Sequence, residues 1–415
     1  MRTLARTVPF PNVAGVCVTS TSGSLVVADA EGHPLRPAIL YDDSRGAAIA
    51  ETLNRQALPS SLSLDSSYSL VKAAWIRQAE PAVWERVRHV LHPADWLAGK
   101  LTGDFGFSDH ANALKLGYDP ERATWSEAVS LAGIPTALLP AVVAPGQQVG
   151  TVSAVASEET GLPGNTAVVA GGTDGVASLI ASGAREPKQV NTTLGTTLVW
   201  KVLAKTKPML SRGTYCHFHP CGLWAAGAAS NTGPGSLLRR DLSTTPSQMD
   251  RLAAASFPSR TVCYLLRGRG ERFPFASEQA VGFVEGHPCN PCEWYAAQLQ
   301  SIAFVERWGY ERLRRCAVEM GDVVFTTGGA AGSDVLAQLR ADVLNCVILR
   351  AHHPTAAFGA AILAAGETVY SGNLLAAVAA MTSVDAAFAP ASERGHQYDE
   401  IYNRFREACA RRGYA

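Results

Sequence analysis

Hydrophobic positions along the chain fall into short runs typical of strands and longer stretches with helical spacing. The clearest pattern lies at 168–197, where the apolar run Val168-Val-Ala-Gly-Gly ends shortly before Asp174. A short helical run follows, and then a second strand-like run, Val190–Leu194, ends in a turn around Gly195. Apolar runs bounded by glycine turns are typical of buried strands. We therefore predict the order strand, glycine turn, helix, strand and second tight turn.

The same reading predicts further elements on both sides of this stretch. Strands are expected at 13–18, 24–29, 37–41, 323–327 and 347–350, and helices at 69–79, 81–88, 292–317 and 356–365. The small residues of the helix at 356–365 predict tight packing on a flat surface. Each half begins with strands and then alternates helices with strands, which predicts two similar lobes around a cleft. We place the boundary between domains 1–186 and 187–415.

Composition narrows the class of protein. The 415 residues are 47% hydrophobic and 17% charged, which is enough apolar material for two cores. Lys plus Arg equals Asp plus Glu at 36 each, so no global charge favours nucleic acid or an anionic membrane. No run approaches the roughly 18 apolar residues of a membrane span, and the first residues lack the apolar core of a secretory signal.

Cysteine usage predicts reduced thiols and leaves two clusters to weigh. The nine cysteines are an odd number scattered through a large chain, which is typical of a cytosol-like compartment. Cys289-Asn-Pro-Cys292 is a lone CxxC, for which a loop is favoured over a metal or redox site. The segment Cys216–Cys221 fits a ligand cluster or a plain hairpin, and the hairpin is favoured. No residue is assigned to a metal.

Three strand ends carry residues suited to chemistry. Asp174 opens a helix, where its carboxylate could take a proton or merely cap backbone N–H groups. The turn at Gly195 offers backbone N–H groups and threonine hydroxyls that could hold a phosphate. The pair Gly328-Gly329 could let a ligand approach the backbone, or serve tight packing. None has the spacing of a P-loop, and together the three features favour phosphoryl transfer.

The chain resembles the FGGY family of carbohydrate kinases, within the sugar kinase/Hsp70/actin-like superfamily. The resemblance spans nearly the whole chain from Val13 onward, and two stretches are most similar to the xylulokinase-like branch that includes D-ribulokinases: Ser108–Tyr118 and Gly268–Pro274. The matching motifs are Arg36–Arg45, Gly161–Asp174, Leu194–Thr197, Gly328–Ser333, Gln338–Leu344 and Ala357–Leu363.

The resemblance implies an α/β fold of two ribonuclease H-like (actin-like ATPase) lobes and a role for each matching residue. Asp174 matches the catalytic base, which also contacts the sugar, and Thr21 and Ser22 match the sugar-contacting turn. Two features depart from the family: Ala330 stands where a third glycine is usual, and Gly175 where many xylulokinases have asparagine. The residues implied to bind the nucleotide are Thr193, Gly195, Thr196, Gly328, Gly329, Ala330 and Ser333.

The largest departure concerns the front of the first lobe. In the family an Asp-x-Gly-Thr turn that grips phosphate and magnesium precedes the strand matched by Val13–Val18, and this sequence has only twelve residues there. We therefore expect an N-terminally truncated first lobe that lacks about two central strands, which exposes backbone groups. Either the chain is an incomplete version of a longer kinase or it is a degenerate relative. The retained Asp174 and nucleotide turns favour the former.

The resulting hypothesis is ATP- and Mg²⁺-dependent phosphorylation of a ketopentose, with D-ribulose favoured over D-xylulose. The alternative is a catalytically inactive relative that serves as a nucleotide- or sugar-binding scaffold or regulator. The expected partner is a small-molecule sugar, with no nucleic acid and no membrane, and a homodimer is left open. The expected location is cytoplasmic, and a plastid stays open if an upstream transit segment is missing.

Overall fold

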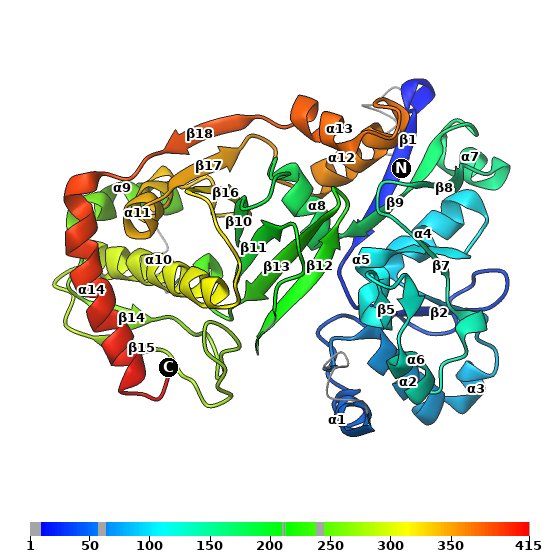
Figure 1. The fold of residues 1–415 in the computed structure, drawn as a ribbon, viewed down its shortest axis with the longest axis horizontal. Coiled ribbons are helices and arrows are strands. Elements are labelled where there is room, and N and C mark those ends of the chain that lie inside the picture. The colour runs from blue at the N-terminus through cyan, green and yellow to red at the C-terminus, as the bar shows by residue number, and fades with distance from the viewer. Residues whose placement is uncertain (1–9, 57–63, 210, 212, 238–244, 415) are drawn as a thin grey trace. The chain divides into compact units, whose positions relative to one another are not determined.

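The structure is a computed structural model that describes residues 10–56, 64–209, 211, 213–237 and 245–414. The chain forms two compact units, drawn in Figure 1. Unit 1 comprises Met1–Ala181, Phe218–Cys221 and Ala356–Met381. Unit 2 comprises Ser182–His217, Gly222–Thr355 and Thr382–Ala415. Each unit has an α/β organisation with its own sheet.

The central sheet of unit 1 has the order β1-β9-β8, and it is built around a fully buried strand. All seven residues of β9 (Ala167–Thr173) are buried, which explains its nearly uninterrupted apolar sequence. It pairs parallel with β1 (Gly15–Ser20) and antiparallel with β8 (Gln148–Thr151). Helix α8 (Asp174–Ala181) follows β9 directly, as the sequence predicted. The expectation that this lobe lacks strands stays a prediction.

A helix from late in the chain completes unit 1. Helix α12 (Ala356–Thr368) packs against α8, and a Cβ atom added at Gly359 would lie 1.8 Å from the carbonyl oxygen of Ala177. The prediction of tight packing is confirmed, but the predicted flat surface is wrong in part. Its small residues allow close approach to another helix as well as to β1, where Gly15 lies against the side chain of Thr368.

The remainder of unit 1 has a separate hydrophobic core, built from residues between Leu25 and Ile134. Strand β2 (Val26–Ala28) pairs with β3 (His89–Leu91), and α2 (Ser69–Ala79) has the predicted bounds. The strand expected at 37–41 is wrong, because Ile39 makes only an isolated bridge with Leu25. Further elements are α1 (Ala47–Gln56), α3 (Pro81–Trp84), α4 (Pro93–Thr102), β4 (Phe107–Asp109), α5 (His110–Ala113), β5 (Tyr118–Asp119), β6 (Thr124–Trp125), α6 (Glu127–Leu131), β7 (Ala141–Val143), α7 (Ala154–Thr160) and α13 (Leu374–Met381).

The sheet of unit 2 has the order β12-β13-β11-β10-β16-β17-β18. On one side of β10 the strands are antiparallel, and on the other β16 and β17 run parallel to it. The bounds are β10 (Val190–Leu194), β11 (Leu198–Ala204), β12 (Thr214–His219), β13 (Leu223–Ala229), β16 (Val323–Thr327), β17 (Val347–Ala351) and β18 (Val384–Phe388), and β14 (Val262–Tyr264) pairs separately with β15 (Phe283–Glu285).

The helices of unit 2 enclose an aromatic-rich core against this sheet. Helix α10 (Pro291–Arg315) buries Trp294, Trp308 and neighbouring apolar residues, as its helical spacing predicted. A buried ion pair joins Glu306 of α10 to Arg340 of α11 (Asp334–Leu344), with an N–O distance of 2.6 Å. Helices α9 (Pro246–Ala253) and α14 (Ser392–Ala410) complete the unit.

The hairpin favoured for Cys216–Cys221 is confirmed, whereas the loop favoured for Cys289–Cys292 is wrong in part, because Cys292 lies in the first turn of α10. The segment Cys216–Cys221 lies in the β12–β13 hairpin, with Gly222 at a φ of 78°. The CxxC opens α10, where the Asn290 side chain caps the helix. None of the nine cysteines is joined in a disulfide bond.

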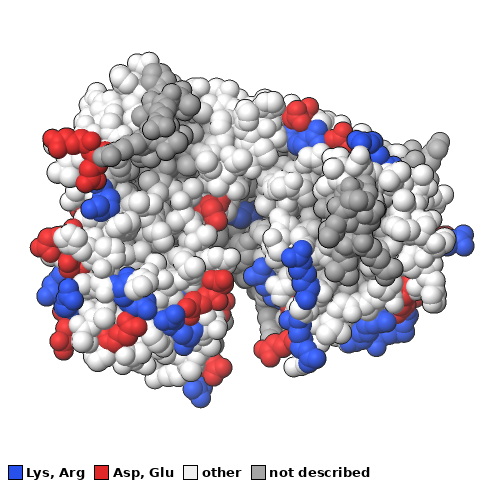
Figure 2. Space-filling model, turned by 180° about the vertical axis from the view of Figure 1, so that it is seen from behind, with Lys and Arg blue, Asp and Glu red and all other residues white. Residues whose placement is uncertain are grey.

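Charged side chains of both signs mix over the surface. Figure 2 shows Lys and Arg close to Asp and Glu over much of the face that it displays. Within the described residues, no helix has the length and apolarity needed to cross a membrane.

Candidate active site

The first group of predicted residues lies at one edge of the unit 1 sheet. Strands β1 and β9 are parallel, and Ser20 is the register partner of Thr173. Thr21 and Asp174 are the next residues of the two strands, so both leave the sheet at its carboxyl edge. Ligand sites of parallel sheets lie at this edge. The structure therefore brings the predicted base to the predicted sugar turn.

Asp174 lies in the first turn of α8 and is exposed. The Thr173 hydroxyl accepts the N–H of Val176 at 3.3 Å, which is the usual contribution of an N-cap side chain. The Asp174 carboxylate accepts the N–H of the adjacent Gly175 at 2.7 Å. Capping of the helix is thus shared with Thr173. A carboxylate at a helix N-terminus is favoured in its charged form, as a proton acceptor must be.

The turn that carries the predicted sugar residues Thr21 and Ser22 is held by its own hydroxyls. The hydroxyls of Thr21 and Ser24 lie 2.8 Å apart, and Gly23 has a φ of 82°. The Oγ atom of Ser22 is buried and has no hydrogen-bond partner within the described part of the chain. A hydroxyl in this position can bond to a polyol, which matches the predicted role of Ser22.

A β-bulge interrupts the pairing of β1 with β9 shortly before Asp174. Between the pairs Val18–Ala170 and Ser20–Thr173, β1 contributes Thr19 alone and β9 contributes Gly171 and Gly172. The Gly172 N–H donates to Asp109 Oδ2 at 3.1 Å, and its carbonyl accepts from Thr19 Oγ1 at 3.0 Å. Sequence reasoning assigned no role to Asp109 or Thr19. The glycine pair was the only available signal, since adjacent glycines in a strand often mark a bulge.

The second group of predicted residues lies at the carboxyl edge of the unit 2 sheet. Strands β10 and β16 are parallel, and Thr193 is the register partner of Thr327 with hydroxyls 2.9 Å apart. The turn Gly195–Thr197 joins β10 to β11, and Thr196 is exposed. Gly328 begins the next turn. Both predicted nucleotide turns therefore leave the sheet at neighbouring positions.

The turn at Gly328–Ala330 is shaped by close approach to β10. Gly328 has a φ of 93°, and a Cβ atom there would lie 2.6 Å from the carbonyl oxygen of Leu194. A Cβ atom at Gly329 would meet nothing within 4 Å. The Ser333 side chain caps α11 by accepting the Leu336 N–H at 3.0 Å. The backbone of Gly329 is thus open to a ligand beside a capped helix N-terminus.

Further residues contact the turn at Gly195 and the strands that lead to the two turns. Gly235 donates its N–H to the Gly195 carbonyl at 3.2 Å, and a Cβ atom on Gly235 would lie 2.5 Å from Thr196. On the opposite face of the strands, Glu306 accepts from the Thr192 hydroxyl and Arg340 donates to that of Thr326. The sequence showed no signal for these contacts, because they join segments far apart in the chain.

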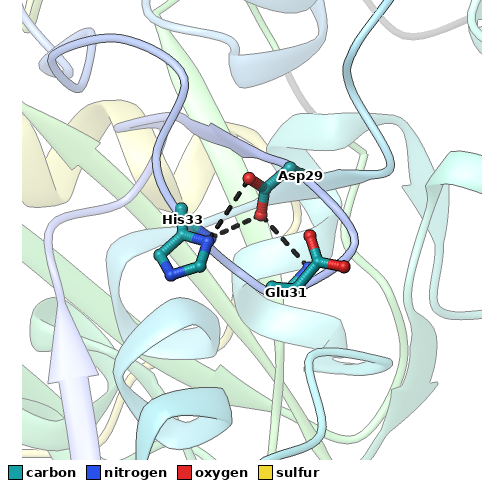
Figure 3. Close-up of side chains that lie close together, drawn as sticks. All are labelled: Asp29, Glu31 and His33. Atoms are coloured by element: carbon teal, nitrogen blue, oxygen red, sulfur yellow. Dashed lines mark hydrogen bonds and ion pairs between the residues drawn. The ribbon is translucent and has the colours of Figure 1, made fainter.

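Among the described residues, one group of potential metal ligands lies on the turn that follows β2. Figure 3 shows Asp29, Glu31 and His33 on the turn that follows β2. The Asp29 carboxylate accepts the backbone N–H groups of Glu31 and His33 at 3.1 and 2.8 Å, and those bonds lower the pKa of Asp29. These bonds account for the group as an ordinary aspartate turn.

Two family models together match most of the chain. Residues 2–181 match the N-terminal domain of the FGGY family of carbohydrate kinases, and residues 192–367 match its C-terminal domain. With two α/β units and phosphate-suited turns at their strand ends, the chain has the architecture of a two-domain phosphotransferase. It belongs to the FGGY family of carbohydrate kinases.

Individual relatives agree with this assignment. A xylulose kinase from Staphylococcus epidermidis is 27% identical over 406 residues, which cover 94% of this chain and 81% of that protein. A glycerol kinase from Enterococcus faecalis is 27% identical over 424 residues, covering 96% and 83%. The structure of a xylulose kinase from Rhodospirillum rubrum is 25% identical, with a TM-score of 0.83 and coverage of 96% and 84%. The chain is therefore a sugar kinase that uses ATP.

Proposed function

We propose that the chain phosphorylates a ketopentose, with D-ribulose preferred over D-xylulose, and that Asp174 is the general base. The observation that carries the proposal is the place of Asp174, which lies in the first turn of α8 beside the hydroxyl-lined turn at Thr21 and Ser22. Among the relatives are xylulose kinases, which act on a ketopentose by name. The preference for D-ribulose rests on Ser108–Tyr118 and Gly268–Pro274, the two stretches most similar to the branch that includes D-ribulokinases. Gly175, where many xylulokinases have asparagine, is a departure at the proposed sugar site.

In the proposed reaction, Asp174 accepts the proton of the terminal sugar hydroxyl. The oxygen attacks the γ-phosphorus of ATP, a new P–O bond forms, and the bond between the γ-phosphorus and the oxygen bridging to the β-phosphate breaks to release ADP. The residues proposed to receive the phosphates are Thr193, Gly195 and Thr196. A carboxylate positioned in this way contributes about 100- to 10,000-fold to the rate.

The nucleotide site fits ATP through its backbone. Gly328 lets the turn lie close against β10, Gly329 leaves the main chain open to a ligand, and Ala330 keeps a small side chain beside them. With Ser333 at the start of α11, these residues are proposed to hold the adenosine portion. Mg²⁺ bound with the ATP phosphates would neutralise their charge. No side chain is assigned to the metal.

Replacing the proposed base tests the mechanism directly. We expect Asp174→Asn to remove detectable sugar-dependent ADP release, a loss of about 100- to 10,000-fold, because asparagine cannot take the proton. ATP binding, measured by calorimetry, should stay unchanged, since the proposed nucleotide residues are elsewhere. Asp29→Asn, which alters an exposed turn, is the matched control and should keep full turnover.

The same assay separates the proposal from its alternatives. D-Ribulose should give a higher kcat/KM than D-xylulose, and the reverse order would refute the preference. Unchanged turnover in Asp174→Asn would refute the role of the base. Wild-type protein that binds ATP but releases no ADP with any sugar would instead support a non-catalytic scaffold.

The compartment is part of the proposal. The odd number of cysteines, scattered through a large chain, supports a reducing location such as the cytoplasm.

A further inference from the structure

We infer that Asp109 is a positioning residue that fixes the direction in which β9 delivers Asp174. The inference rests on the proposed role of Asp174 as the base. It concerns the contact between the buried Asp109 carboxylate and the peptide of Gly172, two residues before Asp174.

The bulge in β9 lies directly before Thr173 and Asp174. The extra residue of a bulge has backbone groups that the strand ladder does not satisfy, and bulges beside active sites re-aim the side chains that follow. Here Gly172 has a φ of 71°, a conformation that favours glycine. Gly171 is equally constrained, because a Cβ atom there would lie 1.8 Å from the carbonyl oxygen of Val18.

Asp109 connects this bulge to the start of α5 through hydrogen bonds. Its Oδ1 atom accepts the N–H groups of Ala111 and Asn112 at 2.8 and 3.0 Å, which fixes the carboxylate to the start of α5. Its Oδ2 atom accepts the side-chain amide of Asn112 at 2.7 Å and the N–H of Gly172 at 3.1 Å. The side chain is 1% exposed. Burial and the nearby Asp95 raise its pKa, while three of these donors lower it.

Thr19 holds the following peptide group of the same residue. Its hydroxyl donates to the Gly172 carbonyl at 3.0 Å, so the peptide groups of the bulged residue are held from β1 and from the N-terminus of α5. A cavity of about 20 Å³, room for about one water, borders Gly171 and Asp109. The strand end therefore has space to shift when one of the bonds is removed.

A small displacement of Gly172 would move the proposed base, Asp174, by nearly the same distance. Only Thr173 separates the held peptide from Asp174, and the hydroxyl of Thr173 is tied to the first turn of α8. Rate depends steeply on the placement of a base, and a displacement of about 1 Å can cost about 100-fold. Asp109 therefore acts on the reaction through Asp174.

The experiment compares Asp109→Asn with Asp119→Asn in the full chain. At position 109 the new side-chain amide would face two N–H donors. Asp119, by contrast, accepts backbone N–H groups in an exposed turn and pairs with the exposed Arg122. We expect kcat per ATP-binding site to fall about 100-fold in Asp109→Asn, with the sugar KM within about threefold. Asp119→Asn should match the wild type.

Thr19→Val provides a second variant should Asp109→Asn fail to fold. It removes the bond to the Gly172 carbonyl with little change of shape, and kcat should fall about 10-fold. A merely structural role would lower the melting temperature and leave kcat per folded molecule unchanged. Wild-type kcat in either folded variant would overturn the inference. Survival of turnover in Asp174→Asn would overturn the proposed function instead, so the two failures are distinguishable.

Discussion

His110 is a partly buried histidine next to Asp109, and burial of its ring lowers its pKa to about 4. The unfolded chain therefore binds a proton that the folded chain does not as the pH falls from about 6.5 to 4, and stability is lost over that window. Between about pH 6.5 and 4, we expect the free energy of unfolding of His110→Phe to fall by about 1–2 kcal/mol less than that of the wild type. Urea unfolding at several pH values measures the difference. The exposed His287→Gln should follow the wild type, and parallel curves for all three proteins would contradict the prediction.

Arg340 forms a fully buried pair with Glu306 and also donates to Thr326. Removing one member of such a pair leaves an uncompensated charge, so Arg340→Ala should lower the free energy of unfolding by about 3–5 kcal/mol. Arg122→Ala removes a pair in which the arginine side chain is 82% exposed, and it should cost less than about 1 kcal/mol. Equal losses in the two variants, measured by chemical denaturation, would argue against the role of burial.

The residues that sequence reasoning found and missed differ in physical kind. Asp174 and Gly328 could be predicted because each follows an apolar run, where the chain itself marks the strand end. Asp109 could not, since its partner Gly172 is 63 positions away along the chain and only the folded bulge brings them together. Local patterns reveal where a strand stops, whereas long-range hydrogen bonds require the fold.

At the scale of elements, the close contact between α12 and α8 requires that Gly359 has no side chain. Gly359→Ala would place a Cβ atom 1.8 Å from the Ala177 carbonyl oxygen, which forces the helices apart. We expect a loss of about 1–3 kcal/mol in unfolding free energy. In α14, a Cβ atom added at Gly395 would meet nothing within 4 Å. Gly395→Ala should therefore raise the free energy of unfolding by up to about 1 kcal/mol. Thermal unfolding of both variants would reveal whether the sign differs.

Prediction of elements succeeded where hydrophobic spacing was sustained. Helix α2 has the expected bounds, and α10 lies within two residues of them at each end. The segment 37–41 is apolar enough for a strand but makes only the bridge at Ile39. A short apolar run predicts that a segment is buried, but it does not predict that a neighbouring strand pairs with it.

At the scale of the whole molecule, unit 1 is assembled from separate parts of the sequence. A fragment of residues 1–186 lacks 356–381, which supplies α12 and α13. We expect this fragment to unfold without a cooperative transition, because the apolar faces of α8 and β1 lose their cover. Joining 356–381 through a Gly/Ser linker should restore the transition in urea. Cooperative unfolding of the fragment alone would refute this expectation.

The domain boundary between residues 186 and 187 stays a prediction. The sequence divides the chain once, because each half repeats the order of strands followed by alternating helices and strands. The contacts of 356–381 belong to unit 1, and no pattern in that small-residue segment states which helix it touches. Small residues predict close approach but not the identity of the partner.

The return of the chain to unit 1 affects how the protein is made. Residue 181 ends the first part of unit 1 and residue 381 ends the last, so about 200 further residues are synthesised before the unit is complete. At about 5–20 residues per second, the ribosome needs about 10–40 s for that stretch. During this interval the nascent first unit carries an uncovered apolar surface, which makes it a client for chaperones that act during translation.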